Sequence, residues 1–269
     1  MKQLLTVYVL LVFIGCVPQQ QNYKTGITQK PNDSINQTTF TDSTEIKPKN
    51  SADYEISTYD NLGLASQLIS HKETLRQLSG KAVFRVIHNK LVSTLNTRHK
   101  EYFLSNPNYQ VLSAAKGNLF RSNSDDYAFV TYDIMEIRVS ILVYNDNKKE
   151  YLDLYRDLKI ENGLKSAECN YFAFGSLDYQ LGNEIVYQEE SLIKKPERYL
   201  ENPSIKICDV LLDNGFVINS GCLSTKVSKN DLSNSLCIST SAVYNNWECL
   251  KLNKSKTGFL IFYGQAFAD

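Results

Sequence analysis

The chain has 269 residues, of which 42% are hydrophobic and 22% charged, a composition typical of folded globular proteins and unlike that of disordered ones. Lys plus Arg and Asp plus Glu both number 29, and removing residues 1–15 takes away only Lys2, leaving 28 basic against 29 acidic residues. This balance argues against binding to nucleic acid, which needs a basic patch or stripe. The one local basic group is Lys194, Lys195 and Arg198, which we interpret as a solvated face.

The first residues of the chain read MKQLLTVYVLLVFIGC. Lys2 supplies a positive start, an apolar run extends from Leu4 to Ile14, and Gly15 is the small residue expected before a cleavage site. As a helix this run spans about 16 Å, whereas the hydrocarbon core of a membrane is about 30 Å thick. We therefore predict a signal peptide over residues 1–15, and not a transmembrane helix.

The ending Phe13-Ile14-Gly15-Cys16 resembles the lipobox of bacterial lipoprotein precursors. The resemblance implies that Cys16 becomes the first mature residue, is diacylated on its sulfur and is usually acylated on its amine. Two or three acyl chains anchor a protein stably, whereas one gives only marginal binding. In that family an Asp after the Cys favours the inner membrane. Val17 stands here, so the resemblance favours the outer membrane of a bacterial cell envelope. The alternative is an ordinary secretory signal in which Cys16 is incidental.

Residues 16–53 are expected to form a tether. The part from Pro18 to Lys49 is rich in Gln, Asn, Ser, Thr and Lys and has almost no large apolar residues, so it cannot bury enough surface to offset the entropy of ordering. As a flexible chain it would reach roughly 30–35 Å from the membrane. Residues 54–269 are then expected to form a single domain.

The domain is expected to begin with two amphipathic helices. Ser57 or Asp60 can cap the first, and Gly80 is a natural end for it. The second follows from about Phe84 to Ser105. Each carries an apolar stripe at helical spacing, which predicts packing on another element. The stripes consist of Leu64, Ala65, Leu68, Ile69, Leu75 and Leu78 in the first helix, and of Phe84, Ile87, Leu91, Leu95 and Phe103 in the second.

Strands are predicted from runs of aromatic and β-branched residues, which favour pleated surfaces. Short connections between the first four predict an antiparallel meander with a hairpin turn at Asn145-Asp146-Asn147. A helical pattern follows over 184–200, interrupted by Pro196. Helices first and strands afterwards predict an α+β fold, with N-terminal helices packed on a mainly antiparallel sheet. The predicted strands are 109–115, 127–133, 137–144, 150–158, 204–211, 215–220, 237–244, 247–252 and 258–264.

The loop within 112–130 resembles one FG-GAP or VCBS-type unit, in which oxygens at alternate positions bind Ca²⁺ between two strands. By that resemblance Asn118, Phe120, Ser122 and Asp126 stand at the ligand positions. Phe120 has no oxygen to offer, and only Asp126 keeps a carboxylate. We therefore expect the hairpin shape without its metal. The alternative is a chance likeness of a polar turn between two strands.

Beyond Cys16 the chain has five cysteines. In an oxidising envelope, four of them clustered in sequence suggest two disulfides, whose three possible connectivities the sequence leaves open. Cys169 would then be left over as a small buried residue. The alternative is that the strand cysteines are unbonded core residues. The candidate disulfide cysteines are Cys208, Cys222, Cys237 and Cys249.

The sequence contains no recognised catalytic or cofactor-binding motif. His71, His88 and His99 fall on the two predicted helices without the spacing of a zinc site. His88 and His99 are 11 residues apart, about three helical turns, so they could share a face of one helix. We interpret all three as ordinary histidines, and no metal or cofactor is expected.

The expected function is that of a lipid-anchored envelope protein of non-enzymatic binding or structural type, whose partner is another envelope protein or a glycan. Two alternatives stay open: an envelope hydrolase with dispersed catalytic residues, and an immunity or inhibitor lipoprotein. An enzyme should show a deep pocket with convergent titratable groups. A binding module should show an exposed apolar or aromatic patch, and an inhibitor a protruding loop or edge strand.

Overall fold

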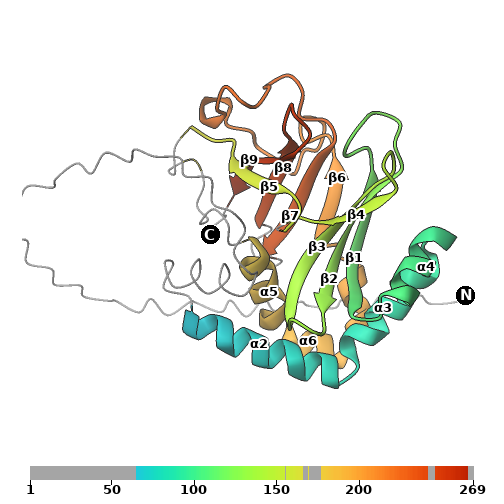
Figure 1. Ribbon diagram of the computed structural model, residues 1–269. Coiled ribbons are helices and arrows are strands. Elements are labelled where there is room, and N and C mark those ends of the chain that lie inside the picture. Colours follow the sequence, from blue (N-terminus) through green and yellow to red (C-terminus); the bar gives the residue numbers. More distant parts are fainter. Residues whose placement is uncertain (1–64, 155, 166–168, 170–176, 242–245, 266–269) are drawn as a thin grey trace, which may run out of the picture. The chain divides into compact units, whose positions relative to one another are not determined.

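A computed structural model describes residues 65–269 except 155, 166–168, 170–176, 242–245 and 266–269 (Figure 1). The predicted signal peptide, Cys16, the tether and the start of the first helix lie outside these residues. Within them, no helix is long and apolar enough to cross a membrane.

The described residues form an α+β fold, which confirms the predicted fold class. The strands form two sheets, whereas the sequence predicted one. The helices are α2 (Ala65–Gly80), α3 (Val83–Thr94), α4 (Thr97–Ser105), α5 (Leu177–Tyr187), α6 (Glu189–Lys194) and the short 3₁₀ helices η2 (Pro196–Leu200) and η3 (Ser220–Cys222). The strands are β1 (Tyr109–Gly117), β2 (Asp126–Asp133), β3 (Arg138–Asn145), β4 (Glu150–Asp153), β5 (Lys159–Asn162), β6 (Ile205–Cys208), β7 (Ser235–Ser241), β8 (Asn246–Leu252) and β9 (Gly258–Gln265).

The first sheet is the predicted antiparallel meander, with strand order β1-β2-β3-β4. Its last hairpin turns where expected, because the side chain of Asn145 accepts hydrogen bonds from the backbone N–H groups of Asn147 and Lys148 at 3.1 and 3.3 Å. Alternate residues of β2 enter different cores, as the two-residue period of a strand requires. Val130 lies in the central core and Phe129 in an aromatic cluster on the opposite face, beneath α4.

The second sheet has the order β5-β9-β8-β7-β6 and is antiparallel except where β5 pairs in parallel with β9. At the start of that parallel pair Gly258 lies opposite Lys159, and a Cβ atom on Gly258 would stand 2.2 Å from the carbonyl oxygen of Lys159. Only glycine therefore allows the two strands to meet there. The outer face of this sheet is covered by the chain between β6 and β7, which contributes Val210 and Phe216.

The two sheets share one central core with the helices. Strand β1 approaches β6 so closely that a Cβ atom on Gly117 would stand 2.6 Å from Cγ2 of Ile207. Helix α3 packs on β1, as the amphipathic pattern predicts, and α5 packs against β3 of one sheet and β7 of the other (Figure 1). Ile69 departs from the predicted stripe of the first helix, since it is exposed while Leu75 is buried.

Several predicted elements are wrong: the strand over 204–211 is limited to Ile205–Cys208, the helix over 184–200 is replaced by α5, α6 and η2, and three more differ as follows. The second helix divides into α3 and α4, because Asn96 takes an extended conformation and its side chain accepts a hydrogen bond from the N–H of His99 at 3.2 Å, which caps a new helix. The strand predicted over 150–158 ends at Asp153, whose N–H donates to the Asp157 carboxylate at 2.7 Å. Residues 215–220 form no strand. At their start the chain turns, and the carboxylate of Asp213 accepts a hydrogen bond from the N–H of Gly215 at 2.9 Å.

The cysteines form two disulfides, as predicted, but not the predicted set. Cys237 on β7 bonds to Cys249 directly opposite on β8, with Cα atoms 4.1 Å apart. Cys222 bonds to Cys169, which the sequence analysis left over, and Cys208 is a free thiol. The reason is register: Cys208 lies opposite Ser235, not opposite Cys237.

The partner of Cys222 is likewise chosen by the fold. The chain after β5 runs beside η3, where Leu164 pairs with Leu223 and the N–H of Lys165 donates to the carbonyl of Cys222 at 2.9 Å. That pairing brings Cys169 within bonding distance of Cys222 although the two are 53 residues apart in sequence.

Candidate functional site

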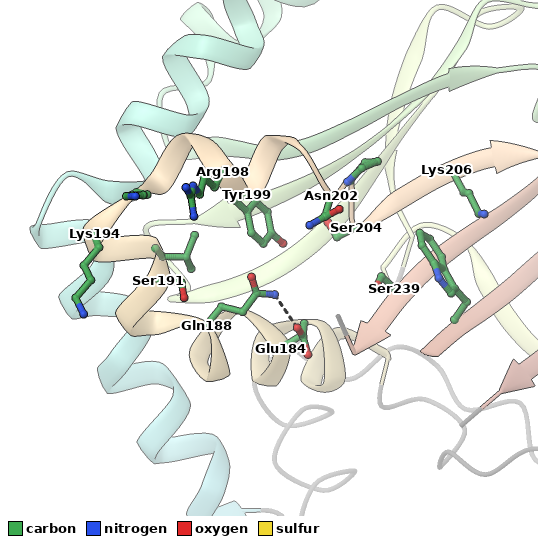
Figure 2. Close-up of a pocket in the computed structure, with 14 residues that line it drawn as sticks. Glu184, Gln188, Ser191, Lys194, Arg198, Tyr199, Asn202, Ser204, Lys206 and Ser239 are labelled. Carbon is green, nitrogen blue, oxygen red and sulfur yellow. Dashed lines mark hydrogen bonds between the residues drawn. The ribbon is translucent and has the colours of Figure 1, made fainter. Parts of the chain in front are cut away.

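A pocket of about 700 Å³ lies between α5, α6 and η2 on one side and β6, β7 and β8 on the other (Figure 2). Its volume falls within the range of pockets that hold small molecules, about 300–1,000 Å³. The walls come from residues 184–206 and, more than 30 residues further along the chain, from Ser239 and Trp247, which pair across β7 and β8. It is therefore a product of the tertiary fold.

The corner between α6 and η2 places the first group of lining side chains. Helix α6 closes with a hydrogen bond from the N–H of Lys195 to the carbonyl of Ser191 at 2.9 Å, and Pro196 then opens η2. In this short helix Tyr199 turns inward and is buried, while the preceding Arg198 stays exposed. One turn thus supplies both a buried hydroxyl and a surface cation.

The interior of the pocket is polar. The side chains of Tyr199 and Ser204 are buried, 8% and 5% exposed. Their hydroxyl groups are neighbours, and among the described residues neither forms a hydrogen bond of normal geometry. In Figure 2 the Tyr199 hydroxyl points into the pocket, on the side of Ser204 and Glu184. Glu184 accepts a hydrogen bond from the Gln188 amide at 2.6 Å. A buried hydroxyl without a hydrogen bond destabilises the folded protein, and these two are placed to form hydrogen bonds with a molecule in the pocket.

Burial raises the pKa of Tyr199 to about 12, an effect that the neighbouring Ser204 hydroxyl opposes and the charge of Glu184 reinforces. The Tyr199 hydroxyl therefore stays protonated near neutral pH. It can donate a hydrogen bond to a ligand, and it is poorly suited to act as a base.

The opposite end of the pocket is aromatic. Trp247, the single Trp of the chain, packs edge to face with Phe216 at 6.2 Å between ring centroids. The Lys206 ammonium lies 4.6 Å from the Trp247 ring centroid and 4.3 Å from that of Phe216, and it pairs with Asp213 at 2.7 Å. The hydrogen bond from Lys206 keeps the pKa of Asp213 below its usual value. These contacts hold the indole ring in place and balance the charge of Lys206.

Three cations, Lys194, Lys195 and Arg198, form what we call the basic rim of the pocket. They are exposed, in agreement with the predicted solvated face, but they also line the pocket. Lys194 pairs with Glu190 at 2.5 Å on an exposed turn of α6. Among the described residues Lys195 and Arg198 have no ion-pair partner. The rim thus has positive charge available for a ligand.

The described lining of the pocket carries few titratable groups besides its cations. Its described lining contains one carboxylate, that of Glu184, and neither His nor Cys. Glycoside hydrolysis commonly uses two carboxyl groups, and acyl transfer needs a nucleophile next to a base. The described lining supplies one carboxyl group, and its Ser and Lys side chains are the available nucleophiles and bases.

The loop that resembles a calcium-binding unit is held together by its last predicted ligand, Asp126. Its carboxylate is 0% exposed and accepts hydrogen bonds from the N–H groups of Leu119 and Phe120, both at 2.8 Å, from the Ser124 hydroxyl, and from the N–H of Asp146 at 2.8 Å. Both carboxylate oxygens therefore bond to the protein's own donors. Of the other predicted positions, Asn118 and Ser122 make no hydrogen bond to Asp126 that the structure records.

The histidines do not come together. The end of α3 at Thr94 puts His88 and His99 on different helices, and His88 accepts a hydrogen bond from the N–H of Val111 at 2.9 Å through its Nδ1. His99, 1% exposed, is surrounded by aromatic rings, and its Nδ1 forms a hydrogen bond with the hydroxyl of Tyr151. Within the described residues no three His, Cys, Asp or Glu side chains are grouped to hold a metal.

Of the residues that line the pocket, the sequence singled out only the basic group Lys194, Lys195 and Arg198. Tyr199, Ser204 and Trp247 were not predicted as site residues. The uniqueness of Trp247 was the only available signal. No family model matches the chain, and neither a curated protein nor a solved structure shows a significant match to it.

Proposed function

We propose that this chain is a lipid-anchored cell-envelope protein whose folded domain binds a small polar ligand without transforming it. The anchoring part rests on the leader and on Cys16, as set out from the sequence. The binding part rests on one observation: the pocket of about 700 Å³ contains the buried hydroxyls of Tyr199 and Ser204, and the described residues give neither a hydrogen bond of normal geometry.

The physical reason is the cost of burying a polar group. A hydroxyl withdrawn from bulk water and left without a hydrogen bond destabilises a protein by about 1–3 kcal/mol. Two such groups facing one pocket are accounted for if a ligand or its waters complete their hydrogen bonds. A hydrolase would need, in addition, a second carboxylate or a nucleophile and base beside Glu184.

The anchor is tested by replacing Cys16 with Ser in cells that process lipoproteins. The native protein should be found in the membrane fraction, at the density of the outer membrane, with an acylated N-terminal Cys by mass spectrometry. The Cys16→Ser variant should leave that fraction. Continued membrane attachment of the variant, or an unmodified sulfur in the native protein, would overturn the assignment.

The binding function is tested with the full lipidated chain in detergent. Thermal unfolding is followed with and without the low-molecular-mass and glycan fractions of the envelope, because a ligand of the folded state raises the unfolding temperature. At least one fraction should stabilise the native chain and not the Tyr199→Phe, Ser204→Ala double variant. The Ser228→Ala variant, altered in an exposed loop, serves as the control and should respond like the native chain. Equal responses of all three proteins, or none, would refute the proposal.

A further inference from the structure

We propose that the ligand of this pocket is a short anionic saccharide, with its ring hydroxyls in the polar interior and its acidic group at the basic rim. The inference rests on the proposed binding function and names the chemical class of the ligand. Four features of the pocket carry it: its volume, its unsatisfied hydroxyls, its aromatic wall and its uneven charge.

The volume and the polar interior define the neutral part of the ligand. About 700 Å³ accommodates one or two sugar rings. Besides Tyr199 and Ser204, the interior presents the side chains of Gln188, Asn202 and Ser239, each of which can donate and accept hydrogen bonds. A molecule with many hydroxyl groups matches such a lining, and an apolar molecule would leave the buried hydroxyls unpaired.

The aromatic wall matches the less polar face of a sugar ring. The C–H groups of a pyranose form a flat apolar face that packs on an aromatic ring. Trp247 and Pro203 offer such a surface at the pocket. The Lys206 ammonium and Phe216 hold the Trp247 ring before any ligand arrives, so little conformational entropy is lost on binding.

The charge of the pocket defines the acidic part of the ligand. Lys206 is balanced by Asp213 and Lys194 by Glu190, which leaves Lys195 and Arg198 opposed only by Glu184 among the lining residues. Glu184 lies in the interior, where it accepts from Gln188 and can also accept from a ligand hydroxyl. The guanidinium of Arg198 is suited to pair with a carboxylate or phosphate through two hydrogen bonds.

The test is a glycan array probed with the full lipidated chain in detergent, carrying uronate, sialylated and phosphorylated oligosaccharides beside their neutral counterparts. Uridine diphosphate and inorganic phosphate are added in competition. The strongest binder is then titrated calorimetrically at about 50 and about 500 mM salt, because screening weakens pairing at an exposed rim. Binding should favour the acidic member of a pair by at least about tenfold and weaken at high salt.

Three variants locate the site. Lys195→Ala with Arg198→Ala should reduce affinity about tenfold and remove most of the salt dependence. Tyr199→Phe should weaken binding about fivefold without lowering the unfolding temperature, because the hydroxyl it removes forms no hydrogen bond of normal geometry with the described residues. The exposed Lys229→Ala serves as the control for charge and should bind like the native chain.

The outcomes separate the ligand class from the binding function itself. The proposal that the ligand is an anionic saccharide would be refuted by any of three results. These are no binding to any glycan, equal binding of neutral and acidic members, and full competition by uridine diphosphate or phosphate alone. If an envelope fraction still stabilised the native chain and not the Tyr199→Phe, Ser204→Ala variant, the binding function would stand without it. If no fraction had that effect, both proposals would fall.

Discussion

Glu248 carries a buried carboxyl group whose ionisation should control the stability of the fold. It lies on β8 opposite Ile238, which belongs to the central core, and is 2% exposed. Its Oε1 has no hydrogen-bond partner, and burial raises its pKa to about 8. Gln has nearly the same shape and no charge, so the Glu248→Gln variant removes the ionisation and keeps the packing.

The direction of the effect follows from where the proton is held. Between pH 4.5, the ordinary pKa of the group, and about pH 8 the folded chain keeps a proton that the unfolded chain has lost. The free energy of unfolding therefore falls as the pH rises through this window and is constant on either side of it. At 1.36 kcal/mol for each tenfold change in the equilibrium, the native chain should lose about 3 kcal/mol between pH 5 and pH 8 through this one group.

The assay is urea unfolding of the oxidised protein at pH 5, 6, 7 and 8, followed by circular dichroism, since the fluorescent Trp247 adjoins the altered residue. The Glu248→Gln variant should lose about 3 kcal/mol less than the native chain over this range, and at pH 8 it should be the more stable of the two. Glu190→Gln, whose side chain is 83% exposed, is the matched control and should follow the native chain. Parallel pH profiles for the native chain and Glu248→Gln would refute the reasoning.

Three further predictions concern other buried groups. Burial lowers the pKa of His99 from 6.5 to about 4, so the folded chain should lose up to about 3 kcal/mol as the pH falls through that interval, and His99→Gln should show less acid sensitivity in urea titrations. Asp126→Ala should lower the free energy of unfolding by about 3 kcal/mol or more, because it leaves buried N–H donors unpaired. Asp125→Ala, which removes an exposed ion pair, should keep the native urea midpoint. Equal urea midpoints for the two variants would contradict this prediction. Peptide mapping without reductant should show the two disulfides of the structure, and Cys169→Ser should cost about 4 kcal/mol while Cys208→Ser leaves the midpoint near the native value.

The proposed binding function differs in form from what the sequence suggested for a binding module. For a binding module an exposed apolar or aromatic patch was expected, and the proposed site is a polar pocket with a single aromatic wall. The basic group at Lys194, Lys195 and Arg198 was correctly predicted to be exposed. Its place at the rim of a pocket depends on Trp247 and Ser239, which come from strands about 40 or more residues further along the chain.

Local pattern alone determined much of the secondary structure. The strands β1, β2 and β3 lie within two residues of their predicted ranges. Their two-residue alternation, which buries Val130 on one face and Phe129 on the other, is a property of adjacent residues and can be recognised in the sequence. The turn at Asn145 is local for the same reason, since its side chain bonds to the backbone two and three residues on. Errors arose where a side chain competed with the expected element, as Asn96 did by capping α4 and Asp213 by forming a turn.

Only the tertiary structure decided which distant residues meet. The sequence predicted two disulfides in this chain but not that Cys169 would bond to Cys222, because that choice depends on the chain after β5 running beside η3. The pocket, too, depends on long-range packing, because α5, which carries Glu184, packs against both sheets, and η2, which carries Tyr199, packs against α3 and α6. Period and composition are properties of neighbouring residues, whereas a partner or a pocket depends on long-range packing of the whole domain, which no local pattern contains.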